Sequence, residues 1–321
     1  MLTLFAIPKA FRGEFNQIQR NAITSWTLLE PKPEIILLGD DEGTAEVAKE
    51  FGVRHVSGVE RNDYGTPLLS SLFEIAQQVG SGSLFAYVNA DIILLNDFMR
   101  TIQQIPFQRF MLTGQRWNLD FDEAIAPTLG WSEQLCHRAM TLGALEGPQA
   151  MDYFVFTRNT YTHIPPFAIG RLCWDNWMLY SALNLNIPLI DATEAIVAVH
   201  QNHDYNHHPD GKKGVFLGEE AQYNLQLLGG KHYTYFMLDL ADWQITPQGL
   251  RKPSFSWKRL DRRLDMLSLA RPKSRLLYGA LLGLVRYGKQ LSAVPPKLLG
   301  IPARIVSRLR GLKRSKPSPF E

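Results

Sequence analysis

The 321-residue sequence has only two cysteines, Cys136 and Cys173. Two thiols cannot build a disulfide framework or a multi-thiolate zinc site within one chain, and a reducing compartment is the simpler expectation. An uninterrupted apolar run of about twenty residues is also missing, which argues against a membrane-spanning helix. Residues 1–8 lack a basic leader and are more typical of a first strand than of a signal peptide. We therefore expect a cytoplasmic protein.

Several common catalytic motifs are absent as well. No Gly-x-Gly-x-x-Gly follows the first expected strand, which weakens a dinucleotide-binding interpretation. No Gly-x-x-x-x-Gly-Lys-Ser/Thr loop is present, which argues against a P-loop phosphotransferase. Neither Gly-x-Ser-x-Gly nor His-Glu-x-x-His occurs, so the usual hydrolase and zincin signatures are missing.

The charge is distributed unevenly along the chain. The net charge is +3, but residues 251–321 contain eighteen Lys and Arg against three Asp and Glu. Residues 1–250 therefore carry an excess of acidic side chains. This asymmetry predicts two regions, 1–250 and 251–321, with different electrostatic character.

Strands and helices alternate in the N-terminal part. The pattern predicts strand 2–7, helix 16–29 with Asn16 at its N-cap, strand 34–38, helix 44–51 and strand 53–56. Because β-α-β crossovers are right-handed, such a series builds a parallel sheet. We expect an α/β fold with a mostly parallel sheet flanked by helices.

Polar side chains follow two of the expected strands. Asp40 and Asp41 come after strand 34–38, and Asn89 and Asp91 follow the apolar run 84–88. The carboxyl ends of parallel strands share one rim, where open α/β sheets bind ligands. Oxygen ligands at this rim suit a divalent cation that bridges nucleotide phosphates. The alternative is that Asn89 and Asp91 simply form a turn.

Other candidate phosphate contacts surround this rim. The polar loop 60–67 contains Arg61 and Thr66 and leads into a predicted helix, 68–78, whose amino end can attract phosphate. A capped helix with a surface arginine is the alternative. Arg116 follows the predicted strand 110–113 and places another cation near a strand end.

Two later clusters complete the candidate site. Asp175 lies between Trp174 and Trp177 near the start of a helix, an arrangement that suits a sugar ring, although the tryptophans can equally be core residues and Asp175 a helix cap. Asp175 can accept a proton from an attacking hydroxyl. Four of the eight histidines fall in residues 200–208. His200 directly follows the predicted strand 194–199, and we predict that it is a metal ligand.

The order of these elements resembles that of GT-A-fold (Rossmann-like) glycosyltransferases over residues 1–240. The resemblance implies that Asp40 or Asp41 contacts the nucleoside and that Asp91 and His200 hold Mn²⁺ or Mg²⁺ on the diphosphate. It also implies that Asp175 is the catalytic base of an inverting transfer. Asn89 stands where an Asp-x-Asp motif has its first carboxylate.

The C-terminal extension combines basic and aliphatic residues. Basic side chains flank the apolar run 276–285, and a second segment, 298–312, spaces Ile and Leu among arginines. Such segments suit an anionic membrane surface and predict peripheral association at its inner face. A nucleic-acid arm does not need the aliphatic residues, so no nucleic-acid partner is expected. A helical subdomain packed on the core is the other alternative.

The sequence thus predicts a hexosyltransferase-like enzyme that moves a sugar from a nucleotide diphosphate sugar to a saccharide or lipid-linked acceptor, in polysaccharide biosynthesis. A sugar nucleotidyltransferase and a non-catalytic nucleotide- or sugar-binding protein are the alternatives.

Overall fold

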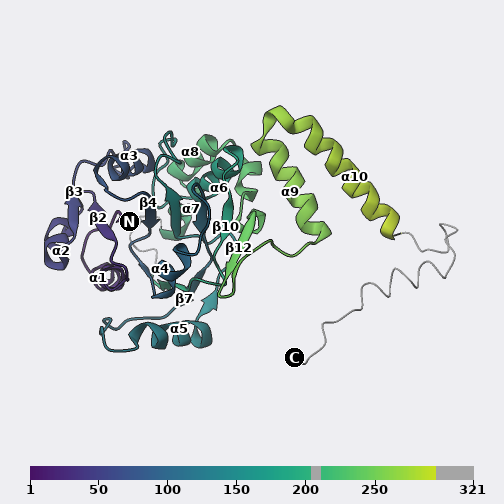
Figure 1. Cartoon of the computed structure of the whole chain (residues 1–321). Helices are drawn as coiled ribbons and strands as arrows, with labels where there is room; N and C mark the ends of the chain where they lie inside the picture. The colour runs from purple at the N-terminus through teal and green to yellow at the C-terminus, as the bar shows by residue number, and fades with distance from the viewer. Residues whose placement is uncertain (204–210, 294–321) are drawn as a thin grey trace, which may run out of the picture. The chain divides into compact units, whose positions relative to one another are not determined.

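A computed structural model describes residues 1–203 and 211–293 of the chain (Figure 1). The chain divides after Ser254 into a first unit, Met1–Ser254, and a second unit that begins at Phe255. The first unit is an α/β domain, so the predicted fold class is confirmed. The histidines at positions 207 and 208 and the segment 298–312 lie outside the described residues.

The described part of the first unit contains a nine-stranded sheet with the order β13-β12-β10-β6-β9-β4-β1-β2-β3. Its strands are β1 Leu2–Ala6, β2 Glu34–Leu38, β3 Arg54–Val56, β4 Leu84–Val88, β6 Met111–Thr113, β9 Tyr153–Thr157, β10 Leu189–Asp191, β12 Trp243–Thr246 and β13 Gly249–Arg251. Five neighbouring pairs are parallel and three, which involve β9 or β13, are antiparallel. The expected mostly parallel sheet is therefore present.

The direction of β9 decides which side chains meet. Because β9 runs antiparallel to β4, Val88 at the end of β4 pairs with Tyr153 at the start of β9. Asp152, which precedes β9, is consequently at the same rim as Asn89, and the backbone N–H of Asn89 donates to the Asp152 carbonyl at 2.9 Å.

Helices cover both faces of the sheet (Figure 1). They are α1 Glu14–Thr27, α2 Thr44–Phe51, α3 Leu69–Val79, α4 Asp97–Ile102, α5 Trp131–Leu142, α6 Trp174–Asn184, α7 Gly211–Leu217 and α8 Glu219–Leu228, with short 3₁₀ turns at Lys231–Tyr235 and Leu238–Leu240. Successive side chains of β1 alternate between the faces. Leu4 joins an aliphatic core with Trp26 of α1, whereas Phe5 packs edge-on against Phe73 of α3 at 5.1 Å.

A second, four-stranded sheet carries the other half of the site. Its order is β5-β11-β7-β8, and its strands are β5 Ile92–Ile93, β7 Arg116–Leu119, β8 Ala144–Leu145 and β11 Ala198–Gln201. His200 pairs with Ile92 on one side and with Asn118 on the other.

Two predicted boundaries are wrong. The strand predicted at 194–199 begins only at Ala198, because residues 192–196 form a turn in which the N–H groups of Ala195 and Ile196 both donate to the Ala192 carbonyl. His200 therefore lies inside a strand. The first helix begins at Glu14 after Gly13, and Asn16 is not its N-cap but accepts a hydrogen bond from Arg20 within the helix.

The described part of the second unit consists of α9 Trp257–Ala270, a 3₁₀ turn at Pro272–Ser274 and α10 Arg275–Ala293. The Ser256 hydroxyl caps α9 by accepting from the Arg259 N–H at 3.1 Å. Arg286 of α10 pairs with Asp261 of α9 at 3.1 Å. Across the described residues, none of the helices combines the length and the hydropathy needed to cross a bilayer.

Candidate active site

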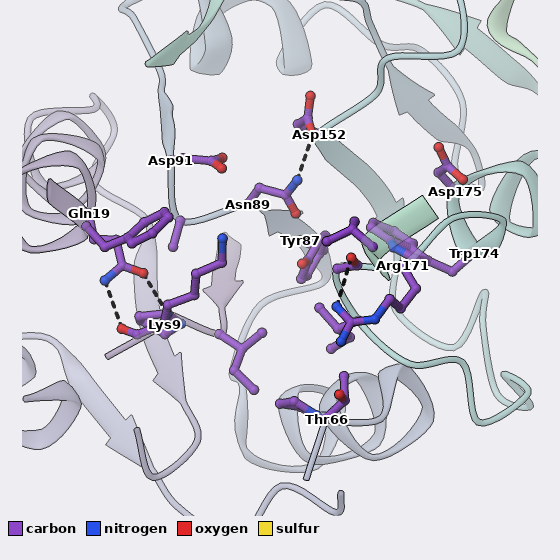
Figure 2. A pocket seen from close by; sticks show the side chains of 18 of the residues that line it. Lys9, Gln19, Thr66, Tyr87, Asn89, Asp91, Asp152, Arg171, Trp174 and Asp175 are labelled. Atoms are coloured by element: carbon purple, nitrogen blue, oxygen red, sulfur yellow. Dashed lines mark hydrogen bonds between the residues drawn. The ribbon is translucent and has the colours of Figure 1, made fainter. Parts of the chain in front are cut away.

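A cavity of about 400 Å³ opens at the rim where β1 and β4 end and β9 begins (Figure 2). This volume is within the range of small-molecule sites. Eight of the nine site residues predicted from the sequence line it: Asp41, Arg61, Thr66, Asn89, Asp91, Arg116, Asp175 and His200. The ninth, Asp40, is exposed outside the lining, because its carboxylate accepts a hydrogen bond from the Gly58 N–H at 2.9 Å.

One wall of the cavity brings a carboxylate and two imidazoles together. The Nε2 atom of His203 lies 3.2 Å from Asp91 Oδ2, and the Nε2 atom of His200 lies 3.7 Å from the same oxygen. One ligand atom from each of the three residues lies within 4.8 Å of the others. His203 was not singled out in the sequence, because nothing in a His-rich segment shows which ring turns inward.

Buried amides hold this wall in place. The Gln201 side chain donates to the carbonyls of Asp91 and Ile18, at 3.2 and 2.8 Å. Asn21 of α1 in turn donates to Gln201 Oε1 at 2.9 Å. Gln201 and Asn21 are almost completely buried, so breaking these bonds would leave polar groups unsatisfied in the interior. The backbone around Asp91 is thereby fixed to α1 and β11.

The protonation states suit cation binding. Burial raises the pKa of Asp91, but the hydrogen bond from His203 and the nearby His200 outweigh it and hold that pKa below its usual range. Burial lowers the pKa of His200 more than the Asp91 carboxylate raises it. The favoured forms are thus a carboxylate and a neutral imidazole at His200, which are the forms that ligate metals.

The wall also passes a test of fit for a divalent cation. Asp91 Oδ1 and His200 Nδ1 are buried and have no hydrogen-bond partner among the described residues, which is unusual for buried polar atoms. One carboxylate with two imidazoles is a mixed oxygen and nitrogen donor set, which suits a first-row transition-metal dication such as Mn²⁺ better than Mg²⁺, because Mg²⁺ prefers oxygen ligands throughout.

Asn89 is engaged by a carboxylate that the sequence analysis did not assign. Its Nδ2 donates to Asp152 Oδ1 at 2.6 Å (Figure 2), and Arg116 Nη1 donates to Asp152 Oδ2 at 3.0 Å. Both oxygens of Asp152 therefore have partners. This explains why the expected first carboxylate is an amide, since an aspartate at position 89 would face Asp152 with like charge.

Asp175 lies on another side of the cavity, beyond Asp152 in Figure 2. It is in the first turn of α6, after Cys173, whose φ of 89° is a left-handed conformation that non-glycine residues rarely adopt. Burial, with a contribution from Asp152, raises the pKa of Asp175 to about 6. Trp174 beside it contacts Tyr87 edge-on at 5.4 Å, whereas Trp177 is in the core against Phe167.

A further ion pair lies in the cavity lining. Arg61 Nη2 and Asp41 Oδ2 are 2.6 Å apart, and Arg61 Nη1 donates to the Gly65 carbonyl at 2.7 Å. The backbone N–H of Thr66 donates to Asn62 Oδ1 at 2.9 Å, so this donor already has an acceptor. Phosphate or nucleoside contacts of Asp41, Arg61, Thr66 and Arg116 stay predictions.

The Asn89–Asp152 contact generates a testable prediction. Asn89→Asp should lower the melting temperature at pH 7.5, because two carboxylates then meet where a 2.6 Å hydrogen bond existed. In the double variant Asn89→Asp/Asp152→Asn an amide again faces a carboxylate. We expect it to be more stable than the sum of the single changes by about 0.5–3 kcal/mol in urea unfolding. Additive effects would show that the two side chains do not interact.

No protein-family model matches the chain, and no curated protein matches it significantly. Among solved structures, it is similar to glucosyl-3-phosphoglycerate synthase from Mycobacterium tuberculosis in complex with Mn²⁺, UDP and glucosyl-3-phosphoglycerate. The TM-score is 0.42 and the identity 14%, over 72% of this chain and 81% of that chain. The same enzyme with Mg²⁺ and UDP gives 0.43 and 15%, over 72% and 80%. A structure described as a mycobacterial protein gives 0.44 and 15%, over 72% and 76%.

Proposed function

We propose that this chain is a glycosyltransferase that uses a nucleotide diphosphate sugar and a divalent cation, with Mn²⁺ preferred. The proposal depends on the presence of two groups of residues in one cavity. One wall clusters Asp91, His200 and His203, and the other presents Asp175 with a pKa raised to about 6. A cation site and a carboxylate with a basic role are the two parts that this transfer needs.

Asp91, His200 and His203 are the proposed ligands of the cation. A divalent cation bound there supplies Lewis-acid neutralisation of the departing diphosphate. Asp41 and Arg61 lie elsewhere in the lining as an ion pair, which offers one acceptor and one donor to a nucleoside. Asn89 and Asp152 lie between Asp91 and Asp175 in Figure 2, and hydrogen bonds join Asp152 to both Asn89 and Arg116.

Asp175 is the proposed base. Above pH 6 its carboxylate is ionised and accepts the proton of the acceptor hydroxyl. The new bond forms between that oxygen and the anomeric carbon while the bond from the same carbon to the diphosphate breaks. The nucleoside diphosphate leaves with the electron pair. A single displacement of this kind inverts the anomeric centre.

The second unit suits a lipid-linked or membrane-borne saccharide acceptor. Its helix α10 exposes large apolar side chains, among them Leu276 and Leu284, and exposed basic residues such as Arg275 and Arg286 lie on the same helix. Apolar residues that insert beside cations that meet headgroups are typical of helices lying on an anionic bilayer. We infer a cytoplasmic enzyme that binds the inner face of a membrane peripherally.

Nucleotide binding tests the donor site. We expect one of UDP, GDP, CDP, ADP and dTDP, at about 100 times its dissociation constant with Mn²⁺, to stabilise the protein by about 2.7 kcal/mol. Asp91→Asn should remove the Mn²⁺-dependent part of the thermal shift, whereas Asp122→Asn, a change in an exposed carboxylate outside the cavity, should not. No shift with any diphosphate would favour a non-catalytic sugar-binding protein. Release of pyrophosphate on turnover would favour a nucleotidyltransferase.

The raised pKa of Asp175 predicts a pH profile. A general base works only when deprotonated, so kcat/KM should fall about tenfold per unit as the pH drops below about 6. With an ordinary pKa near 3.8, this fall would begin about two units lower. Asp175→Asn should reduce transfer at least about a hundredfold while Mn²⁺–diphosphate binding, measured by thermal shift, is unchanged. Full turnover by this variant would exclude the proposed base.

Vesicle sedimentation tests the membrane surface. The protein should pellet with phosphatidylglycerol vesicles and not with phosphatidylcholine vesicles. Leu276→Asn/Leu284→Asn should weaken this binding at least tenfold, because two exposed apolar side chains are lost from α10. Leu129→Asn, at a fully exposed leucine of the first unit, is the matched control. Equal binding by all three proteins would contradict insertion of α10.

A further inference from the structure

Lys9, three residues after the end of β1, lines the same cavity. Its backbone is held on both sides by Gln19 of α1. The Lys9 N–H donates to Gln19 Oε1 at 2.6 Å, and Gln19 Nε2 donates to the Lys9 carbonyl at 2.8 Å (Figure 2). Gln19 is only 2% exposed, so this double hydrogen bond fixes where the lysine side chain starts.

The side chain is directed into the cavity rather than toward solvent. In Figure 2 it extends from Gln19 toward Asn89 and Asp91. Its Nζ lies 4.2 Å from the centroid of the Phe15 ring, a cation–π contact, and Phe15 packs edge-on against His203 at 5.0 Å. Burial lowers the pKa of Lys9, and the carboxylate of Asp91 is the strongest influence that opposes this shift.

The positive charge of Lys9 therefore acts on the same carboxylate that would hold a divalent cation, without a direct ion pair between Lys9 and Asp91 in the described structure. A cation bound by Asp91, His200 and His203 repels the ammonium group and takes over its counter-charge. The backbone of Lys9 remains fixed by Gln19 and its ammonium remains against the Phe15 ring, so an anion that enters the cavity comes within its reach. In a site that takes a nucleotide diphosphate, the available anion is the distal phosphate.

We propose that Lys9 is a phosphate-binding residue that contacts the distal phosphate of the donor once the cation is bound. The inference rests on the proposed function, because it needs a diphosphate in the cavity. Lys9 then stabilises the leaving group from beside the cation ligands, through a charge-assisted hydrogen bond to the distal phosphate. The positive charge of Lys9 thus weakens cation binding at Asp91 when the cavity holds no diphosphate. Once a diphosphate is bound, Lys9 and the cation both stabilise it.

The test uses Lys9→Gln in the full chain and calorimetric titration. Mn²⁺ alone should bind about threefold or more tightly to the variant, because the competing ammonium is gone. With Mn²⁺ saturating, UDP, GDP, CDP, ADP or dTDP, whichever the wild type binds, should bind at least tenfold more weakly. The corresponding monophosphate should change less than threefold, because it lacks the distal phosphate. Lys9→Arg should retain most of the diphosphate affinity, and Lys49→Gln, at an exposed lysine of α2, is the matched control.

Tighter Mn²⁺ binding combined with weaker diphosphate binding in Lys9→Gln distinguishes a phosphate contact from a structural role. A variant that is merely destabilised loses affinity for Mn²⁺, monophosphate and diphosphate together, and this outcome overturns the inference. Unchanged diphosphate affinity in Lys9→Gln also overturns it, while diphosphate binding by the wild type still supports the proposed function. If the wild type binds none of the five diphosphates, the proposed function fails and the inference fails with it.

Discussion

Backbone hydrogen bonding of β11 between β5 and β7 is the constraint on which the candidate site depends. It places His200 opposite Ile92, the residue that directly follows Asp91, and Gln201 completes the join through the Asp91 carbonyl. Asp91 and His200, more than one hundred positions apart in the sequence, are thus brought together by main-chain hydrogen bonds. Such bonds do not depend on the side chains of the other strand residues. Because β11 has strands on both sides, His200 cannot shift without breaking two ladders. Preorganisation of this kind lets a site bind a cation without first ordering its ligands.

Different environments give the carboxylates of one cavity different properties. Asp152 has a hydrogen-bond partner at each oxygen, from Asn89 and Arg116. Asp91 faces imidazoles, which favour its ionised form, whereas burial and the nearby Asp152 favour the neutral form of Asp175 more than its backbone donors favour the ionised one. Opposite pKa shifts in neighbouring acids are how one site separates an electrostatic role from a proton-transfer role. The division of labour proposed for Asp91 and Asp175 follows from these surroundings rather than from their residue type.

Local patterns predicted much of the fold and part of the site. Apolar runs bounded by turn residues located β2, β4 and α2, and polar residues at strand ends pointed to Asp41, Asn89 and Asp91. Strand direction is a tertiary property, so nothing local indicated that β9 is antiparallel and brings Asp152 to the rim. The sequence likewise did not indicate that Lys9 lines the cavity, because the position of its backbone depends on Gln19, ten residues away on a helix. Asp40 was placed at the site because it follows a strand, yet the competing N–H of Gly58 holds its carboxylate outside the cavity.

The contact between Asn89 and Asp152 also bears on how such a site changes during evolution. The two positions are 63 residues apart, and Asp152 also serves Arg116. A lineage that moves the carboxylate from 152 to 89 by single substitutions must pass either through two facing acids or through two amides beside a largely buried arginine. Both intermediates are unfavourable, so we expect positions 89, 116 and 152 to change together. The three positions together should then be a better marker of kinship than the short motif at 89–91 alone.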